Sequence, residues 1–191
     1  MNKMNKLPIE KAKKPVQVKS KTGKVFTQMR EEAKNDLSKF IIKPKKISEG
    51  VLEYPKIYHG TPTKGIEELD PQRSKRTAFG ANAVVSGSEN PLLSESFTRG
   101  ELGDKPRGEI RIIKGPLKIL DLTSTKGKNI WDNLANNPQK ALEAGYDGIQ
   151  HLNYEKRKIE AFYKDISYDK VKNGHEIQIF RKVKTSEWRQ E

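Results

Sequence analysis

The sequence predicts an α+β fold, in which one compact domain of short strands and short helices follows a basic N-terminal extension. Lysine and proline dominate the first residues, where large apolar side chains are rare. After Tyr54 the apolar residues fall in short runs that glycine and proline interrupt. Because these runs do not alternate regularly between strand and helix patterns, a doubly wound parallel sheet is not favoured. We expect the domain to cover residues 54–184 and to be followed by a C-terminal tail at 185–191.

The charge of the chain is strongly positive and unevenly distributed. Its 191 residues include 38 Lys and Arg against 25 Asp and Glu, a formal net charge of +13, and only 33% are hydrophobic. Residues 1–53 hold 14 of the basic and 6 of the acidic residues. The part up to about residue 24 cannot bury enough surface to offset its chain entropy, so we expect a mobile arm there. Apolar residues at helical spacing then predict one amphipathic helix over 26–41, which ends before Pro44.

Within 54–184 the pattern predicts strands and short helices in an irregular order. One helix has Asn90 as its cap and a proline at its first position, and another begins in the same way at Asn137. Gly115-Pro116 is expected to separate two strands. The predicted strands are 56–59, 82–88, 109–112, 117–122, 148–152 and 175–183, and the predicted helices are 91–97, 129–136 and 138–144.

Missing residue types and motifs exclude several function classes. The chain has no Cys, so disulfides, thiolate zinc sites and cysteine nucleophiles are excluded. No two of its three His have a metal-ligand spacing, and we expect no metal. The G-x-S-x-G, Walker and G-x-G-x-x-G motifs are absent as well. No apolar run could span a bilayer and the N-terminus has no secretory h-region, so we expect a soluble protein, cytoplasmic or delivered into a host cell.

Two strand ends are the best candidates for chemistry. The run 58–61, Tyr-His-Gly-Thr, ends a short strand at a glycine, which lets a ligand approach the backbone closely. Glu176 begins a late strand in which Ile177 and Ile179 share one face. Glu176 and Gln178 therefore share the other face. The alternative is that this glutamate lies on the solvent side of an edge strand.

Taken in order, four pieces of the domain form a recognisable pattern. They are Tyr-His-Gly-Thr on the first core strand, an aromatic residue after a short helix, Gly-Tyr-Asp-Gly-Ile at 145–149, and the late strand-borne Glu176. This order resembles the ADP-ribosyltransferases of the His-Tyr-Glu type, which include diphtheria-like toxins, poly-ADP-ribose polymerases and many bacterial and phage relatives. The stretch 108–117 is similar to the central strand pair of that family. Over residues 54–184 the resemblance implies a split β-sheet core, mixed or antiparallel, that uses NAD as substrate.

The resemblance also implies roles for individual residues. Glu176 would match the catalytic glutamate, which bonds the 2′-hydroxyl of the nicotinamide ribose. His59 would match the first triad position, which bonds the adenosine ribose, and the Gly60 backbone would hold the nicotinamide carboxamide next to Thr61. Phe97 falls where the family usually has a tyrosine that stacks on nicotinamide. Breaking the bond to nicotinamide builds positive charge on the ribose, which a nearby carboxylate stabilises.

The chain departs from the family pattern at two places, and a third residue bears on the acceptor. Residues 80–85 read GANAVV without the usual aromatic pair, so one stacking wall is either missing or supplied by Phe79. Phe97 keeps the ring of the usual tyrosine but lacks its hydroxyl. Gly174 stands two residues before Glu176, where members that modify arginine usually carry an acidic or amide side chain, and this argues against an arginine acceptor.

Two other function classes remain open. The net charge of +13 is typical of a nucleic-acid-binding protein, although no zinc finger, RNP motif or recognition helix accompanies it. The chain could also be a structural phage protein with an inert domain. A transferase requires NAD binding that depends on His59 and Glu176, whereas nucleic-acid binding would be salt-sensitive and survive both changes. For the transferase, a toxin or effector role fits the composition, and the acceptor would be a protein or a nucleic acid.

Overall fold

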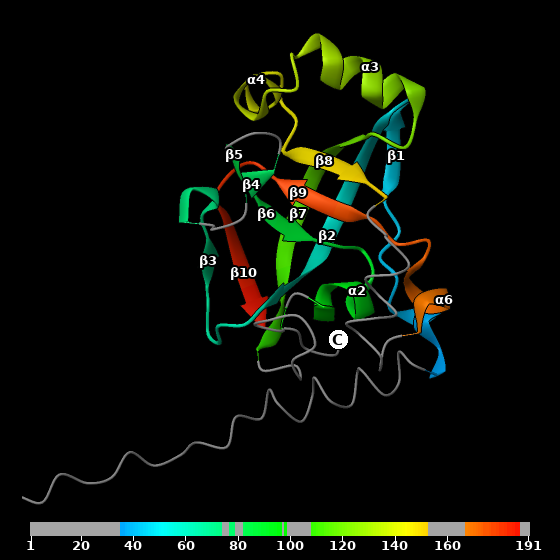
Figure 1. The fold of residues 1–191 in the computed structure, drawn as a ribbon, viewed down its shortest axis with the longest axis vertical. Coiled ribbons are helices and arrows are strands. Elements are labelled where there is room, and N and C mark those ends of the chain that lie inside the picture. The colour runs from blue at the N-terminus through cyan, green and yellow to red at the C-terminus, as the bar shows by residue number, and fades with distance from the viewer. Residues whose placement is uncertain are drawn as a thin grey trace, which may run out of the picture.

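The computed structural model describes residues 35–73, 77–78, 82–96, 98, 108–152 and 167–187. These residues form a mixed β-sheet with a few short helices, so the predicted α+β class is confirmed (Figure 1). The Lys-rich arm and most of the helix predicted at 26–41 lie outside the described residues. The strands are β1 (Lys45–Ser48), β2 (Val51–Thr61), β3 (Glu68–Leu69), β4 (Thr77–Ala78), β5 (Asn82–Ala83), β6 (Val85–Gly87), β7 (Glu109–Asp121), β8 (Gly148–His151), β9 (Glu176–Ile179) and β10 (Val183–Glu187). The helices are η1 (Leu37–Lys39) and η2 (Pro71–Arg73), both 3-10 turns, and α2 (Pro91–Ser96), α3 (Thr125–Asn133), α4 (Pro138–Glu143) and α6 (Tyr168–Val171).

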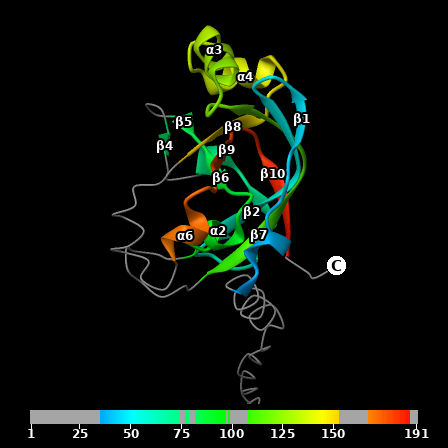
Figure 2. The same cartoon turned by 90° about the vertical axis from the view of Figure 1, so that its right-hand side faces the viewer.

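Strand β7 is common to both halves of the main sheet. The strand order is β1-β2-β7-β8-β9-β6, and β10 pairs with β7 and β3. Among the described strand pairs, β7 and β8 run parallel and the others antiparallel. Helices α3 and α4 lie at one end of the sheet, and α2 and α6 lie toward the other. Figure 2 shows β1, β7 and β10 on one side of the molecule and α2, α6, β4 and β5 on the opposite side.

The prediction of two strands separated at Gly115-Pro116 is wrong, because β7 continues through this dipeptide. The peptide bond between the two residues is cis, and β2 shifts its register between Tyr54 and Lys56 at the same level of the ladder. A side chain on Gly115 would place its Cβ 2.3 Å from the Tyr54 carbonyl oxygen, so the close approach of the strands requires glycine. Gly115 and Pro116 of β7 face the single residue Pro55 of β2, so the extra residue of this bulge belongs to β7. The bulge accommodates the proline, which has no N–H to donate to a ladder.

Other element boundaries also differ from the sequence prediction. The sheet begins with β1 and the first residues of β2, ahead of the expected domain start at residue 54. The last predicted strand is divided between β9 and β10, and β10 extends to Glu187, into the segment expected to be a tail. The caps of two helices are confirmed. Asn90 Oδ1 accepts the backbone N–H groups of Leu92 and Leu93, and Asn137 Oδ1 accepts those at the start of α4.

Three apolar clusters fill the described part of the domain, and the smallest packs Leu92 and Leu93 of α2 with Val171 of α6. The largest one joins β2, β7, β9 and β6 and includes Ile57, Ile113, Ile177 and Ile179, which are fully buried. The second lies under α3 and α4, where Trp131 stacks on Phe180 with a centroid separation of 5.5 Å. The four isoleucines fix the faces of β2, β7 and β9, and therefore decide where the polar residues between them are placed.

Candidate functional site

Ser86, on β6, contacts both residues that the sequence singles out for catalysis. Its backbone carbonyl oxygen lies 2.6 Å from His59 Nδ1, and its Oγ donates to Glu176 Oε1 at 3.0 Å. His59 belongs to β2 and Glu176 is the first residue of β9, so two distant segments meet on one serine. Their strands are not direct neighbours, because β6 pairs with β9 on one side and bridges to β2 on the other.

Glu176 lies in a buried polar row rather than on a solvent face. It is 7% exposed, and its Oε1 also accepts from Gln178 Nε2 at 3.3 Å. The ladder places His151 of β8 directly opposite Glu176, and His151 Nε2 lies 3.2 Å from Gln178 Nε2. Ile177 points to the core between them, so the predicted alternation along this strand is confirmed.

Gln178 has one hydrogen-bonding atom that the described residues do not satisfy. Its side chain is 5% exposed, and Oε1 accepts no hydrogen bond from any described residue. Its Nε2 is engaged by Glu176 and His151. A buried acceptor without a donor is costly in free energy, and ligand-binding sites are common places for one. The row is therefore suited to a ligand that brings O–H or N–H groups.

A close approach of β6 to β2 brings Ser86 within reach of His59. Tyr58 and Ser88 exchange two backbone hydrogen bonds of 2.8 Å each, and the hydroxyl of Ser94 donates to the Tyr58 carbonyl oxygen at 3.0 Å. Gly87 lies between Ser86 and Ser88, where a Cβ would come within 2.6 Å of the Tyr58 carbonyl oxygen. Glycine is therefore required at this position for β6 to lie close to β2.

A second contact fixes the chain just before Glu176. The buried carboxylate of Glu89 accepts the backbone N–H of His175 at 2.9 Å and contacts its Nδ1 at 2.8 Å. The hydroxyl of Ser88 donates to the other oxygen of Glu89 at 3.3 Å. The hydrogen bond with Glu89 raises the pKa of His175 above its ordinary value, and this effect exceeds the opposing effect of partial burial. The contact joins the segment after β6 to the start of β9.

The remaining predicted site residues lie on the same strand or outside the described part. Gly60 and Thr61 are buried at the end of β2, and the Thr61 hydroxyl accepts the backbone N–H of Thr63 at 3.2 Å. Phe97 and Phe79 lie outside the described residues. A hollow of about 1090 Å³ lies over β2, β7 and β10, and its lining does not include His59, Gly60, Thr61 or Glu176.

Two negative findings apply to the residues that the structure describes. Within them, no group of three or more His, Asp or Glu side chains could hold a metal ion. The same residues include no helix that is long and apolar enough to cross a membrane.

The sequence alone did not point to Ser86 or Glu89 as parts of the site. Ser86 interrupts an apolar run in a short buried strand, and a polar residue in such a place is the signal that could have found it. Glu89 precedes the capping residue Asn90. Its hydrogen bonds with His175 join residues that are far apart in the sequence, so no local pattern predicts them. Comparison of the chain with protein-family models, with curated proteins and with solved structures gave no match.

Proposed function

We propose that this chain is an ADP-ribosyltransferase, which transfers ADP-ribose from NAD to a macromolecular acceptor and releases nicotinamide. The observation that carries the proposal is the meeting of His59 and Glu176 on Ser86. A residue pair of this kind, joined from opposite ends of the domain, is expected where two side chains must act on one ligand.

Glu176 has the environment that the reaction needs. In the transferase the bond between ribose C1′ and the nicotinamide nitrogen breaks, its electron pair leaves with nicotinamide, and the acceptor bonds to C1′ and loses a proton. Positive charge develops on the ribose during this step. The carboxylate of Glu176 is held in place by Ser86 and Gln178, so it can stabilise that charge without reorganising.

His59 and Gln178 are proposed to bind the ribose hydroxyls. Because His59 Nδ1 donates to the Ser86 carbonyl oxygen, the ring orientation is fixed and Nε2 is the nitrogen that would contact NAD. The unsatisfied Oε1 of Gln178 is suited to accept a hydroxyl of the nicotinamide ribose, which Glu176 would also contact. Phe97 is proposed to stack on nicotinamide, as the family resemblance implies.

The proposal is tested with labelled NAD and a cell lysate, in which wild type is compared with Glu176→Gln. Glutamine keeps the shape and can still accept from Ser86, but it removes the charge. Losing one preorganised electrostatic contact lowers turnover on the order of 10²–10³-fold. Affinity for NAD should change far less, because the interaction strengthens mainly in the transition state.

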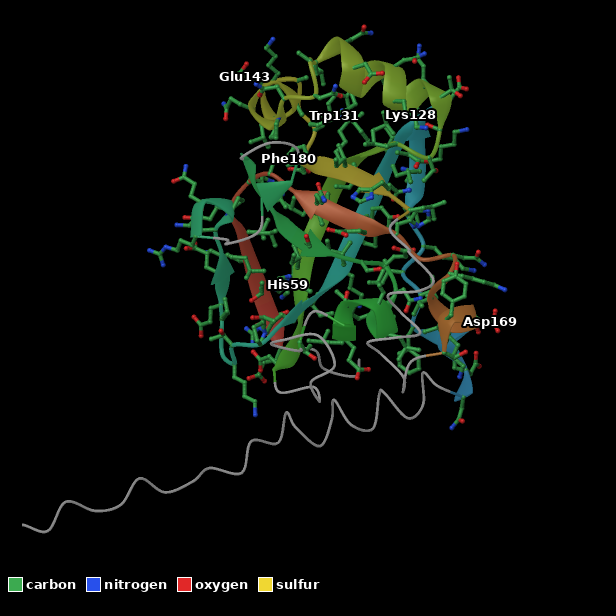
Figure 3. All side chains as sticks on the ribbon, viewed as in Figure 1. His59, Lys128, Trp131, Glu143, Asp169 and Phe180 are labelled. Atoms are coloured by element: carbon green, nitrogen blue, oxygen red, sulfur yellow. The ribbon has the colours of Figure 1, made fainter. Side chains whose placement is uncertain are left out.

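Glu143→Gln is the matched control, since Glu143 is a carboxylate of α4 that bonds Gln139 and lies well away from His59 (Figure 3). This variant should label its acceptor at the wild-type rate. Turnover by Glu176→Gln at the wild-type rate, with both variants folded, would show that the site is wrong. Absence of NAD binding in wild type would favour an inert domain.

A further inference from the structure

Among the described residues that line the hollow of about 1090 Å³ over β2, β7 and β10, many are charged and none is aromatic. Its size is at the upper limit of ordinary small-molecule sites. Its charged lining residues are Lys56, Arg111, Lys114, Lys184, Glu67, Glu68 and Glu187. Charge and breadth together make this hollow a candidate binding surface.

Three of these lysines lie side by side on neighbouring strands. Lys56 of β2 is directly opposite Lys114 of β7 in the ladder. On the other side of β7, β10 pairs with it as far as Thr185 with Ile113, and Lys184 is the next residue of β10. Residues directly opposite one another point to the same face of a sheet, so Lys56 and Lys114 share one face, and Lys184 lines the same hollow. We call this set the lysine row.

The described carboxylates of the hollow form no ion pair with the lysine row. Glu68 lies opposite Lys184 on β3, but its carboxylate pairs with Lys182 at 2.8 Å. None of the three lysines makes an ion pair with a described residue. Arg111 is buried and bonds Glu109 at 3.2 Å. Glu67 and Glu187 also line the hollow, so the lysine row is bordered by carboxylates with which it forms no ion pair among the described residues.

A neighbouring row of the same sheet is arranged in the opposite way. Lys45 of β1 lies opposite Glu53 of β2, and Glu53 lies opposite Lys118 of β7. The charges of this row alternate in sign, and opposite charges directly across from one another stabilise a sheet. Like charges in the same position destabilise it. The lysine row therefore departs from the local rule within a sheet that elsewhere follows it, and such departures mark functional surfaces.

We propose that the lysine row binds the phosphodiester backbone of a nucleic acid. With strands about 4.8 Å apart, the row spans about 10 Å, which is wide enough for successive phosphates. Lysine binds phosphate as a point charge, whereas arginine is favoured where a carboxylate or phosphate is held by two parallel hydrogen bonds. The described part of the lining offers amines and no aromatic ring, which suits contact with the backbone rather than stacking on bases.

This surface is separate from the site proposed for NAD. The described lining of the hollow includes none of His59, Gly60, Thr61 and Glu176, and Lys56 lies three residues from His59 on β2, on the other face of that strand. The proposal therefore does not depend on transferase activity, and Glu176→Gln should bind nucleic acid as wild type does.

The test measures binding of the full chain to a fluorescein-labelled DNA duplex by anisotropy over a series of salt concentrations. One variant carries Lys56→Gln, Lys114→Gln and Lys184→Gln. The control removes the same charge from α3 and α4 through Lys126→Gln, Lys128→Gln and Lys140→Gln, and Lys128 lies far from His59 in Figure 3. Each phosphate contact contributes roughly 0.9 to the slope of log K against log salt. The lysine-row variant should lower that slope by about 2 to 3, and the control should not.

Three results would overturn the proposal. Equal losses in both triple variants would mean that net charge alone binds the duplex. If polyglutamate displaced the labelled duplex as readily as unlabelled duplex does, the surface would bind carboxylates rather than phosphates specifically. A duplex affinity unchanged by the lysine-row variant would mean that the hollow is not involved. Removing like charges should leave the melting temperature unchanged or raise it, and Lys114→Arg should retain binding even if the triple variant misfolds.

Discussion

His175 is bound through its backbone N–H and its imidazole to a single carboxylate, that of Glu89. The two residues are 86 positions apart in the chain, and the contact lies one residue before Glu176. The position of the proposed catalytic carboxylate therefore depends on an acid–base pair outside the polar row.

The stability of the domain should depend on pH through His175. Its pKa is raised in the folded state by the bond with Glu89. The protonated form is therefore stabilised by folding, and this contribution is complete below about pH 6.5 and is lost as pH rises through the folded-state pKa. Urea unfolding of wild type and His175→Gln at pH 5.5 and 8.5 measures this contribution to stability. Wild type should lose more stability than the variant as pH rises, and equal losses would contradict the assignment.

Ser86→Ala should slow turnover while leaving NAD affinity nearly unchanged. The change removes the hydroxyl that donates to Glu176, but it keeps the backbone carbonyl that orients His59. A hydrogen bond to a charged group contributes about 1.5–3 kcal/mol, which corresponds to roughly 10- to 100-fold in rate. Steady-state kinetics and calorimetric titration with NAD separate the two effects.

Ser124→Ala is the control for that experiment. The Ser124 hydroxyl caps α3 by accepting the N–H of Gly127, so its loss should cost about 0.5–2 kcal/mol of unfolding free energy. It should not alter turnover. If both serine variants slowed turnover equally, the effect of Ser86 would be attributed to general destabilisation.

His59→Ala should weaken NAD binding more than it slows the chemical step. The proposed bond of His59 is to a ribose remote from the bond that breaks, so it contributes similarly to the ground state and the transition state. We expect a rise in Kd of about 2- to 10-fold, the value of one neutral hydrogen bond. A loss confined to kcat, with Kd unchanged, would assign His59 to the chemistry instead.

Trp131→Ala should destabilise the domain without changing NAD affinity in the folded protein. Trp131 is 4% exposed and stacks on Phe180 beneath α3, at the end of the molecule away from His59 (Figure 3). Removing a buried aromatic side chain costs about 3–5 kcal/mol. Urea denaturation measures the loss, and Phe180→Leu should cost less because leucine fills more of the vacated space than alanine does. A change in NAD affinity at low urea would mean that the apolar cluster around Trp131 is coupled to the proposed NAD site.

Local patterns predicted the parts of the fold that local forces decide. The caps at Asn90 and Asn137 and the alternation around Glu176 are set by residues within a few positions of one another. The continuity of β7 could not be predicted in this way, because it depends on a bulge that forms where Gly115 and Pro116 pair with β2. Ser86 could not be identified either, since its partners come from β2 and β9 and only the sheet order brings them together.

The sharing of β7 between the two halves of the sheet also has a consequence for how the chain assembles. On one side β7 is paired with β2 over nearly its whole length, and on the other side β10 takes its first part and β8 its last. Both halves join through β7, and its longest ladder, with β2, closes a long loop in the chain between the two strands. We therefore expect the amides of β7 to be the slowest to exchange with deuterium in the native protein, and folding to be slower than in a helical domain of equal length.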